Sequence, residues 1–111
     1  KPNFGCSTKS IFKQVRYYSK PQLSKVKSKN IDFNLLLKMK NDLEPISLKK
    51  YLKLRKIRDY FLNIDQNSYV RMTGSGSTIV GYFKSKKAAL NAMKLLKKNY
   101  KNYWCNLSKT I

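Results

Sequence analysis

The chain has 111 residues and a formal net charge of +20, with 25 Lys and Arg against 5 Asp and Glu. This length has room for one domain with one core, and 41% hydrophobic residues are too many for a disordered basic tail. The absence of His excludes an imidazole base and His-ligated zinc, and five acids are too few for a carboxylate-built catalytic or metal centre. We therefore expect no catalysis from these residues alone.

Cysteine use and hydropathy indicate the compartment. Cys6 and Cys105 form neither a CxxC pair nor the disulfide framework of a secreted domain. No apolar run approaches the roughly 20 residues of a membrane-spanning helix. Since the first residue is Lys1 and no signal-like stretch follows it, we expect a piece of a longer cytoplasmic protein without a membrane partner.

The N-terminal residues predict a strand followed by a short helix. Residues 1–4 are expected to end a strand. Ser7 or Thr8 can cap the helix that follows, because a hydroxyl accepts from a backbone N–H of the first turn. Ile11 and Val15, four positions apart, then form its apolar stripe over two to three turns.

Two consecutive helices are expected in the middle of the chain, after a Lys-rich surface connection at residues 19–30. Apolar residues at four-residue intervals predict the first helix, over residues 31–43. Pro45 should end or bend it, because its ring cannot donate a hydrogen bond. The second helix is predicted over residues 47–63. Its buried side should carry Leu54, Ile57, Phe61 and Ile64, and its wet side Arg55, Lys56 and Arg58.

The last part of the chain predicts a hairpin, a helix and a closing strand. Residues 68–72 and 78–83 are rich in β-branched and aromatic side chains, with a glycine-rich turn between them. Ser85 can cap the helix that follows, and residues 103–107 are expected to form the closing strand. The order of elements indicates an α+β fold. We expect a ferredoxin-like sandwich over residues 1–111, with a mainly antiparallel sheet of about four strands and helices on one face.

The glycine turn is the first candidate site. Gly74, Ser75 and Gly76 lie where backbone can approach a ligand closely, and successive N–H groups with neighbouring hydroxyls suit an anionic ligand. The turn lacks the GxxxxGKS pattern and leads into a strand, so no helix N-terminus supports a phosphate there. Taken alone, it is more typical of a flexible hairpin turn.

The second candidate lies on the first helix. Thr8 and Phe12 are four residues apart and share one helical face. A hydroxyl and an aromatic ring on one face suit a sugar and a stacked base. From the residues alone, we favour the alternative of a capping hydroxyl and a core Phe.

The basic surface is the third candidate, because phosphate backbones attract such a charge through counterion release. Its 21 Lys are spread over every segment, and only four Arg are available for bidentate contacts with bases. We therefore favour a solvated Lys-rich surface over a nucleic-acid-binding module. The positive field would still attract phosphorylated small molecules.

Three segments occur in the order typical of one family: residues 2–12 (PNFGCSTKSIF), 41–44 (NDLE) and 71–83 (RMTGSGSTIVGYF). With the closing helix and strand, they resemble the C-terminal half of the 4-diphosphocytidyl-2-C-methyl-D-erythritol kinases, a branch of the GHMP kinases. The glycine segment is common to GHMP kinases in general. Its combination with STxxxF and NDLE points to this branch.

This resemblance implies an enzyme of non-mevalonate isoprenoid biosynthesis that transfers the γ-phosphoryl of ATP, with Mg²⁺, to the 2-hydroxyl of its cytidyl-diphosphate substrate. The ATP loop and the catalytic Asp and Lys of such kinases belong to an N-terminal domain, to which nothing in residues 1–111 corresponds. We therefore expect this chain to be a substrate-side domain that is inactive without that domain. A GHMP kinase acting on homoserine or mevalonate is a further alternative.

The resemblance also implies roles for five residues. Phe12 matches the aromatic side chain that stacks on cytosine, and Thr8 matches a substrate-contacting hydroxyl. Gly74, Ser75 and Gly76 match a loop whose backbone faces the acceptor end of the substrate and the transferring phosphate. Residues 41–44 are expected to be structural, with Glu44 pairing with a nearby Lys.

Overall fold

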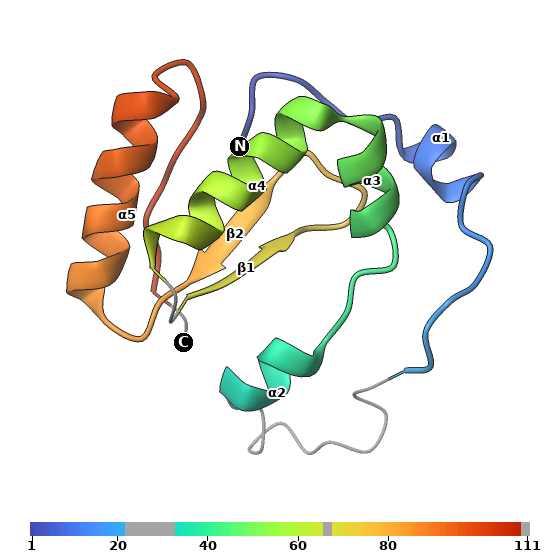
Figure 1. Ribbon diagram of the computed structural model, residues 1–111, viewed down its shortest axis with the longest axis horizontal. Helices are drawn as coiled ribbons and strands as arrows, with labels where there is room; N and C mark the ends of the chain where they lie inside the picture. The colour runs from blue at the N-terminus through green and yellow to red at the C-terminus, as the bar shows by residue number, and fades with distance from the viewer. Residues whose placement is uncertain (22–32, 66–67, 110–111) are drawn as a thin grey trace.

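The computed structural model describes residues 1–21, 33–65 and 68–109. In these ranges the chain forms one short hairpin, with helices both before and after it in the sequence (Figure 1). The elements are α1 (Thr8–Phe12), α2 (Phe33–Lys38), α3 (Glu44–Lys50), α4 (Leu52–Ile64), β1 (Tyr69–Met72), β2 (Ile79–Tyr82) and α5 (Lys86–Asn99).

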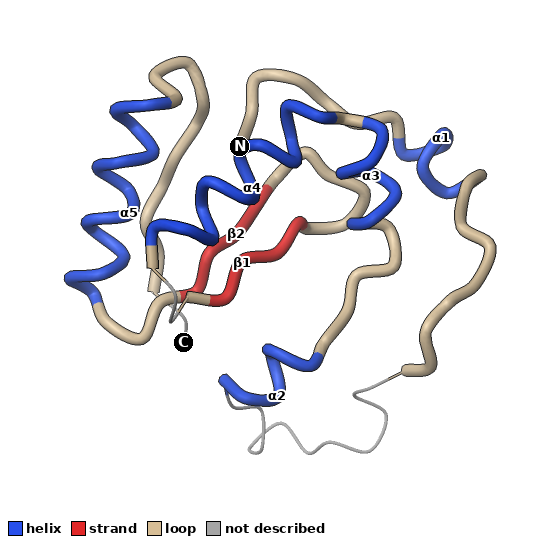
Figure 2. The backbone as a smooth tube through the Cα atoms, in the orientation of Figure 1, coloured by secondary structure: helices blue, strands red, loops and turns tan. Residues whose placement is uncertain are grey.

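The hairpin agrees with the sequence prediction. Strands β1 and β2 are antiparallel, with Tyr69 opposite Tyr82 and Met72 opposite Ile79. Figure 2 shows that the glycine turn leaves the sheet at the end nearest α3. The turn therefore lies close to α3 and to the N-terminal part of the chain.

Helices α4 and α5 build the core with β1. Phe61 of α4, Val70 of β1 and Ala92 of α5 form one buried cluster. A Cβ on Gly81 of β2 would lie 2.5 Å from Cζ of Phe61, well inside normal contact distance. Because residue 81 is a glycine, the Phe61 ring can lie directly against the strand.

The middle helices differ from the prediction in where they begin and end. Pro45 lies in the first turn of α3 and does not end a helix. This position suits proline, because the N–H that it lacks has no partner in a first turn. The single helix expected over residues 47–63 is divided at Tyr51, whose hydroxyl accepts from the Ser7 N–H at 3.0 Å and whose ring stacks on Phe4. These tertiary contacts override the helical propensity of the segment.

The helix predicted over residues 31–43 is shorter in the structure, since α2 ends at Lys38. Its expected start at Ile31, and most of the connection expected at residues 19–30, lie outside the described residues. Helix α1 is also shorter than predicted, and its cap is Ser7, whose Oγ accepts from the Ser10 N–H at 3.3 Å. Ser85 caps α5 as predicted, accepting from the Ala88 N–H.

The two terminal strands of the prediction are wrong for this chain, because residues 1–4 and 103–107 belong to no strand. The two segments still meet: the amino group of Lys1 donates to the backbone carbonyl of Trp104. Pro2 has no N–H to offer a ladder. An extended, partly apolar segment forms a strand only when a sheet edge is available to pair with it.

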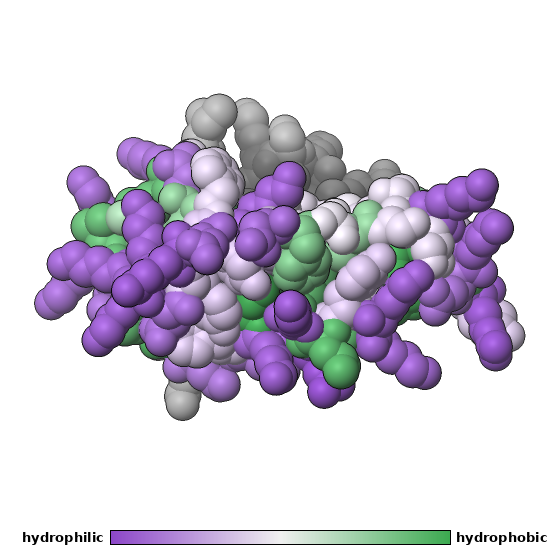
Figure 3. Space-filling view, turned by 90° about the horizontal axis from the view of Figure 1, so that it is seen from above, coloured by the Kyte–Doolittle hydropathy of each residue, from purple (hydrophilic) through white to green (hydrophobic). Residues whose placement is uncertain are grey.

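Hydrophilic side chains cover most of the face seen in Figure 3, with apolar surface in small areas between them. This distribution agrees with a solvated Lys-rich surface. The described helices include none that is long and apolar enough to cross a membrane.

Candidate functional site

The glycine turn joins β1 to β2 and is closed by its own backbone. The Thr73 N–H donates to the Thr78 carbonyl at 2.9 Å, and the Gly76 N–H donates to the Thr73 carbonyl at 3.0 Å. Gly74 has a φ of +53° and Gly76 a φ of +93°. Both values favour glycine over any residue with a Cβ, which explains the sequence of the turn.

The two glycines differ in their surroundings. A Cβ on Gly76 would lie 2.9 Å from Sδ of Met72 and 3.0 Å from Sγ of Cys6, whereas a Cβ on Gly74 would have nothing within 4 Å. The absence of a side chain at Gly76 therefore leaves space for Met72 and Cys6, whereas the space beside Gly74 is open. Burial raises the pKa of the Cys6 thiol above its ordinary value, which keeps the group neutral next to the turn.

Helix α1 meets the turn through a hydroxyl. Thr8 is the first residue of α1, and its Oγ1 lies 2.8 Å from Oγ of Ser75. Ile11, which is fully buried, anchors the helix in the domain. The structure thus joins two predicted sites that lie far apart in the sequence.

Phe12 lies at the end of α1, one helical turn beyond Thr8, and 46% of its surface is exposed. The alternative of a core phenylalanine is therefore wrong. An exposed ring on the same short helix as Thr8 is available for stacking on a planar ligand.

The turn is held from the protein side by Asn41, which precedes α3, and by Ser47 of α3. Nδ2 of Asn41 donates to the carbonyls of Met72 and Gly74, at 2.9 Å each. Oγ of the fully buried Ser47 donates to the Ser75 carbonyl at 3.0 Å. Three backbone carbonyls at the start of the turn therefore point into the domain.

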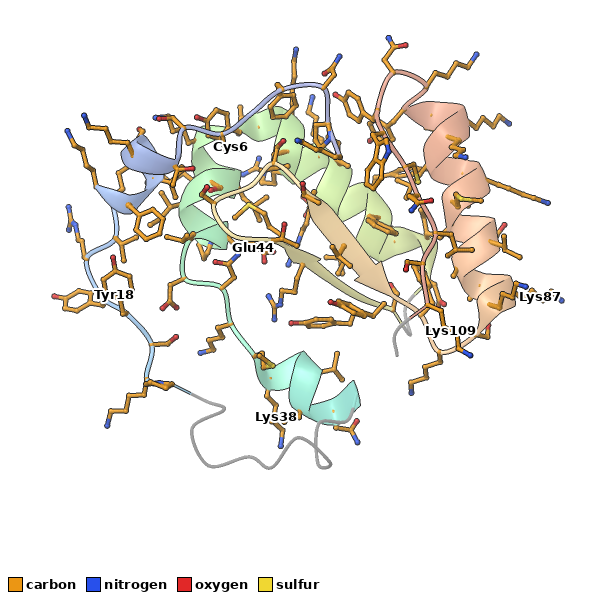
Figure 4. All side chains as sticks on the ribbon, turned by 180° about the vertical axis from the view of Figure 1, so that it is seen from behind. Cys6, Tyr18, Lys38, Glu44, Lys87 and Lys109 are labelled. Atoms are coloured by element: carbon orange, nitrogen blue, oxygen red, sulfur yellow. The ribbon has the colours of Figure 1, made fainter. Side chains whose placement is uncertain are left out.

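Glu44 is the buried acid of this region, as Figure 4 shows between α3 and the sheet. Its Oε2 accepts from the Met72 N–H at 3.2 Å and lies 3.9 Å from Nη1 of Arg71. Its Oε1 lies 3.4 Å from Nε of Arg58. The expectation that Glu44 pairs with a Lys, and that Arg58 belongs to the wet face of its helix, is corrected by these two arginine contacts.

Sequence reasoning assigned residues 41–44 to structure alone and overlooked Ser47. Side-chain bonds to a distant backbone leave no periodic signal in a sequence. The one indication in the sequence was Glu44, an acid between apolar residues in a chain with only five acids, which suggests a buried and paired carboxylate. Among the described residues, no three His, Cys, Asp or Glu side chains gather as a metal site requires.

Comparison with known proteins identifies the family. The sequence model of the protein family described as GHMP kinases C terminal matches residues 24–102. The chain belongs to the GHMP kinase family. No solved structure matches this GHMP kinase chain significantly.

Three similar proteins share one name. A 4-diphosphocytidyl-2-C-methyl-D-erythritol kinase of Pelagibacter ubique is 47% identical over all 111 residues, which cover 40% of that protein. The kinase of the same name from Clostridium botulinum (strain Langeland) is 30% identical over an alignment of 108 residues, which covers 91% of this chain and 38% of the relative. The one from Thermodesulfovibrio yellowstonii is 35% identical over 71 residues, or 64% of this chain and 23% of the relative. The GHMP kinase chain thus spans about two fifths of the length of the Pelagibacter and Clostridium relatives that it matches.

Proposed function

We propose that these residues form the C-terminal, substrate-side domain of an ATP-dependent kinase that phosphorylates the 2-hydroxyl of 4-diphosphocytidyl-2-C-methyl-D-erythritol. Membership of the GHMP kinase family supports the reaction class, and the names of the relatives support the substrate. The enzyme acts in non-mevalonate isoprenoid biosynthesis in the cytoplasm.

The contact between Thr8 and Ser75 carries this proposal. It joins α1, which offers the exposed Phe12 ring, to a turn that offers backbone N–H groups. A cytidyl-diphosphate substrate has a planar base at one end and a phosphorylated sugar alcohol at the other. Phe12 stacks on the base, Thr8 contacts the substrate one helical turn away, and Gly74, Ser75 and Gly76 face the acceptor hydroxyl and the transferring phosphate.

The chemistry of phosphoryl transfer suits a domain of this kind, because such catalysis is mostly positioning and charge stabilisation. The amide N–H groups of Gly74 and Ser75 have no hydrogen-bond partner within the described ranges, so they are available to an oxyanion. The excess of Lys adds a positive field that attracts ATP and the diphosphate substrate.

We propose that ATP and Mg²⁺ are held mainly by an N-terminal domain, together with the catalytic Asp and Lys.

The test is an ATP-dependent phosphorylation assay of the full-length protein with three acceptors: the cytidyl-diphosphate substrate, homoserine and mevalonate. We expect turnover of the first only. Turnover of either other acceptor instead would identify a different GHMP kinase. Activity of residues 1–111 alone would contradict the assignment of the catalytic groups to another domain.

The rival class, a nucleic-acid-binding module, has a separate test. Nonspecific electrostatic binding to RNA or DNA falls steeply with salt, so we expect little binding above about 0.2 M salt. Tight binding that persists there would favour the rival. The family match supports the kinase.

A further inference from the structure

We propose that Asn41 is a positioning residue for phosphoryl transfer, which sets the direction of the peptide groups in the glycine turn. This inference rests on the proposed function, in which the turn faces the acceptor hydroxyl. The effect of Asn41 is indirect: it touches the backbone of the turn, and the turn touches the substrate.

The first observation is that, among the residues that the structure describes, β1 pairs with β2 along one edge and has no strand along its other edge. Residue pairs in antiparallel strands alternate between bonded and non-bonded, and Met72 is next to the bonded pair of Thr73 and Thr78. Its N–H and C=O therefore point away from β2. Glu44 accepts from that N–H and Asn41 donates to that carbonyl, so two side chains take the place of a strand.

The second observation is that Asn41 reaches beyond the strand into the turn. The same Nδ2 that donates to Met72 also donates to the Gly74 carbonyl at 2.9 Å. In a trans peptide the carbonyl and the next N–H point in opposite directions. Holding the Gly74 carbonyl against Asn41 therefore directs the Ser75 N–H away from the domain, toward the side on which a ligand can approach.

The third observation is that the amide group of Asn41 is itself fixed. Its Oδ1 accepts from the Leu43 N–H at 3.0 Å, which assigns the oxygen and leaves both N–H donors to the two carbonyls. Aspartate has nearly the same shape but no donors, and its charge would repel both carbonyl oxygens. The chemistry of this position therefore requires an amide.

Asn41→Asp in the full-length kinase tests the proposal, with Asp42→Asn as the matched control. Asp42 belongs to the same segment and accepts from the N–H and hydroxyl of Ser19, away from the turn. We expect Asn41→Asp to lower kcat at least 10-fold while KM for the acceptor changes less than 3-fold. The control should retain kcat within 2-fold. Equal kcat in both variants would overturn the proposal.

A second measurement does not depend on activity or on the identity of the acceptor. In amide NMR spectra of the folded full-length protein, Asn41→Asp should shift the Gly74 and Ser75 signals and Asp42→Asn should not. If Asn41→Asp fails to fold, Asn41→Ala replaces it, since it removes the same two donated hydrogen bonds without adding a charge. Unchanged Gly74 and Ser75 signals would overturn the positioning role, whereas an inactive wild-type protein would contradict only the proposed function.

Discussion

The side-chain oxygens of Thr8 and Ser75 lie 2.8 Å apart, although 67 positions separate the two residues in the sequence. This hydrogen bond ties α1 to the glycine turn. It therefore couples the helix that carries Phe12 to the backbone that faces the proposed phosphate.

Removing this hydroxyl should weaken catalysis. Thr8→Val keeps the shape of the side chain and loses the bond, which is worth about 1 kcal/mol and thus about a 5-fold decrease in kcat/KM. Thr8→Ser keeps the hydroxyl and should remain close to the wild type. Steady-state kinetics of the full-length protein compare the two. An equal loss in both variants would mean that the hydroxyl is not what matters.

Phe12→Ala should raise KM for the cytidyl-diphosphate substrate. Stacking on a base is worth about 1–3 kcal/mol, which corresponds to an increase of about 5-fold to 150-fold. Because Phe12 is 46% exposed, its loss should change the melting temperature little. Phe12→Tyr is the control, since it retains a ring. An unchanged KM in Phe12→Ala would reject the stacking role.

Alanine at the two glycines of the turn should have different effects. Gly74→Ala meets no atom within 4 Å and costs about 1–2 kcal/mol for its positive φ, so the protein should fold and lose activity. Gly76→Ala adds a steric conflict with Met72 and Cys6 and should lower the melting temperature more. Thermal denaturation followed by circular dichroism separates them. The same melting temperature for both variants would contradict this account.

Glu44→Gln should destabilise the fold, because Arg58 and Arg71 lose their buried partner. Removing one member of a buried pair costs about 3–5 kcal/mol, and we expect the lower end because these arginine side chains are 27% and 30% exposed. Urea denaturation measures the loss.

Asp59→Asn is the matched control for Glu44→Gln. Asp59 also contacts Arg58, at 3.3 Å, but its side chain is 50% exposed. Surface pairs contribute about 0–1 kcal/mol, so the control should unfold almost as the wild type does. Equal destabilisation by the two variants would assign the effect to Arg58 rather than to burial.

The elements that could be predicted from the sequence are those with local signals. The hairpin follows from strand propensity on both sides of a glycine turn, and α5 follows from its Ser85 cap and apolar spacing. The break at Tyr51 could not be predicted, since it depends on contacts with Ser7 and Phe4 more than 40 positions away. The terminal strands failed for the same reason, because pairing requires a partner that local sequence does not specify.

The candidate site was predictable in its parts but not in its assembly. Family resemblance indicated Thr8, Phe12 and the glycine turn as separate segments. It did not indicate that Asn41 and Ser47 hold the turn, because a single side chain bonded to a distant carbonyl has no recognisable spacing. Only the three-dimensional contacts show that these two residues hold the turn.

The arrangement of α1 and the turn has an evolutionary consequence. The turn is secured from the protein side by Asn41 and Ser47, and α1, a helix of only five residues, joins it through the Thr8 hydroxyl. A lineage could therefore replace this one short helix, and so acquire a different acceptor, while the phosphate-facing backbone stayed intact. Under the proposed function, substrate preference and transfer chemistry can diverge independently in kinases built on this plan.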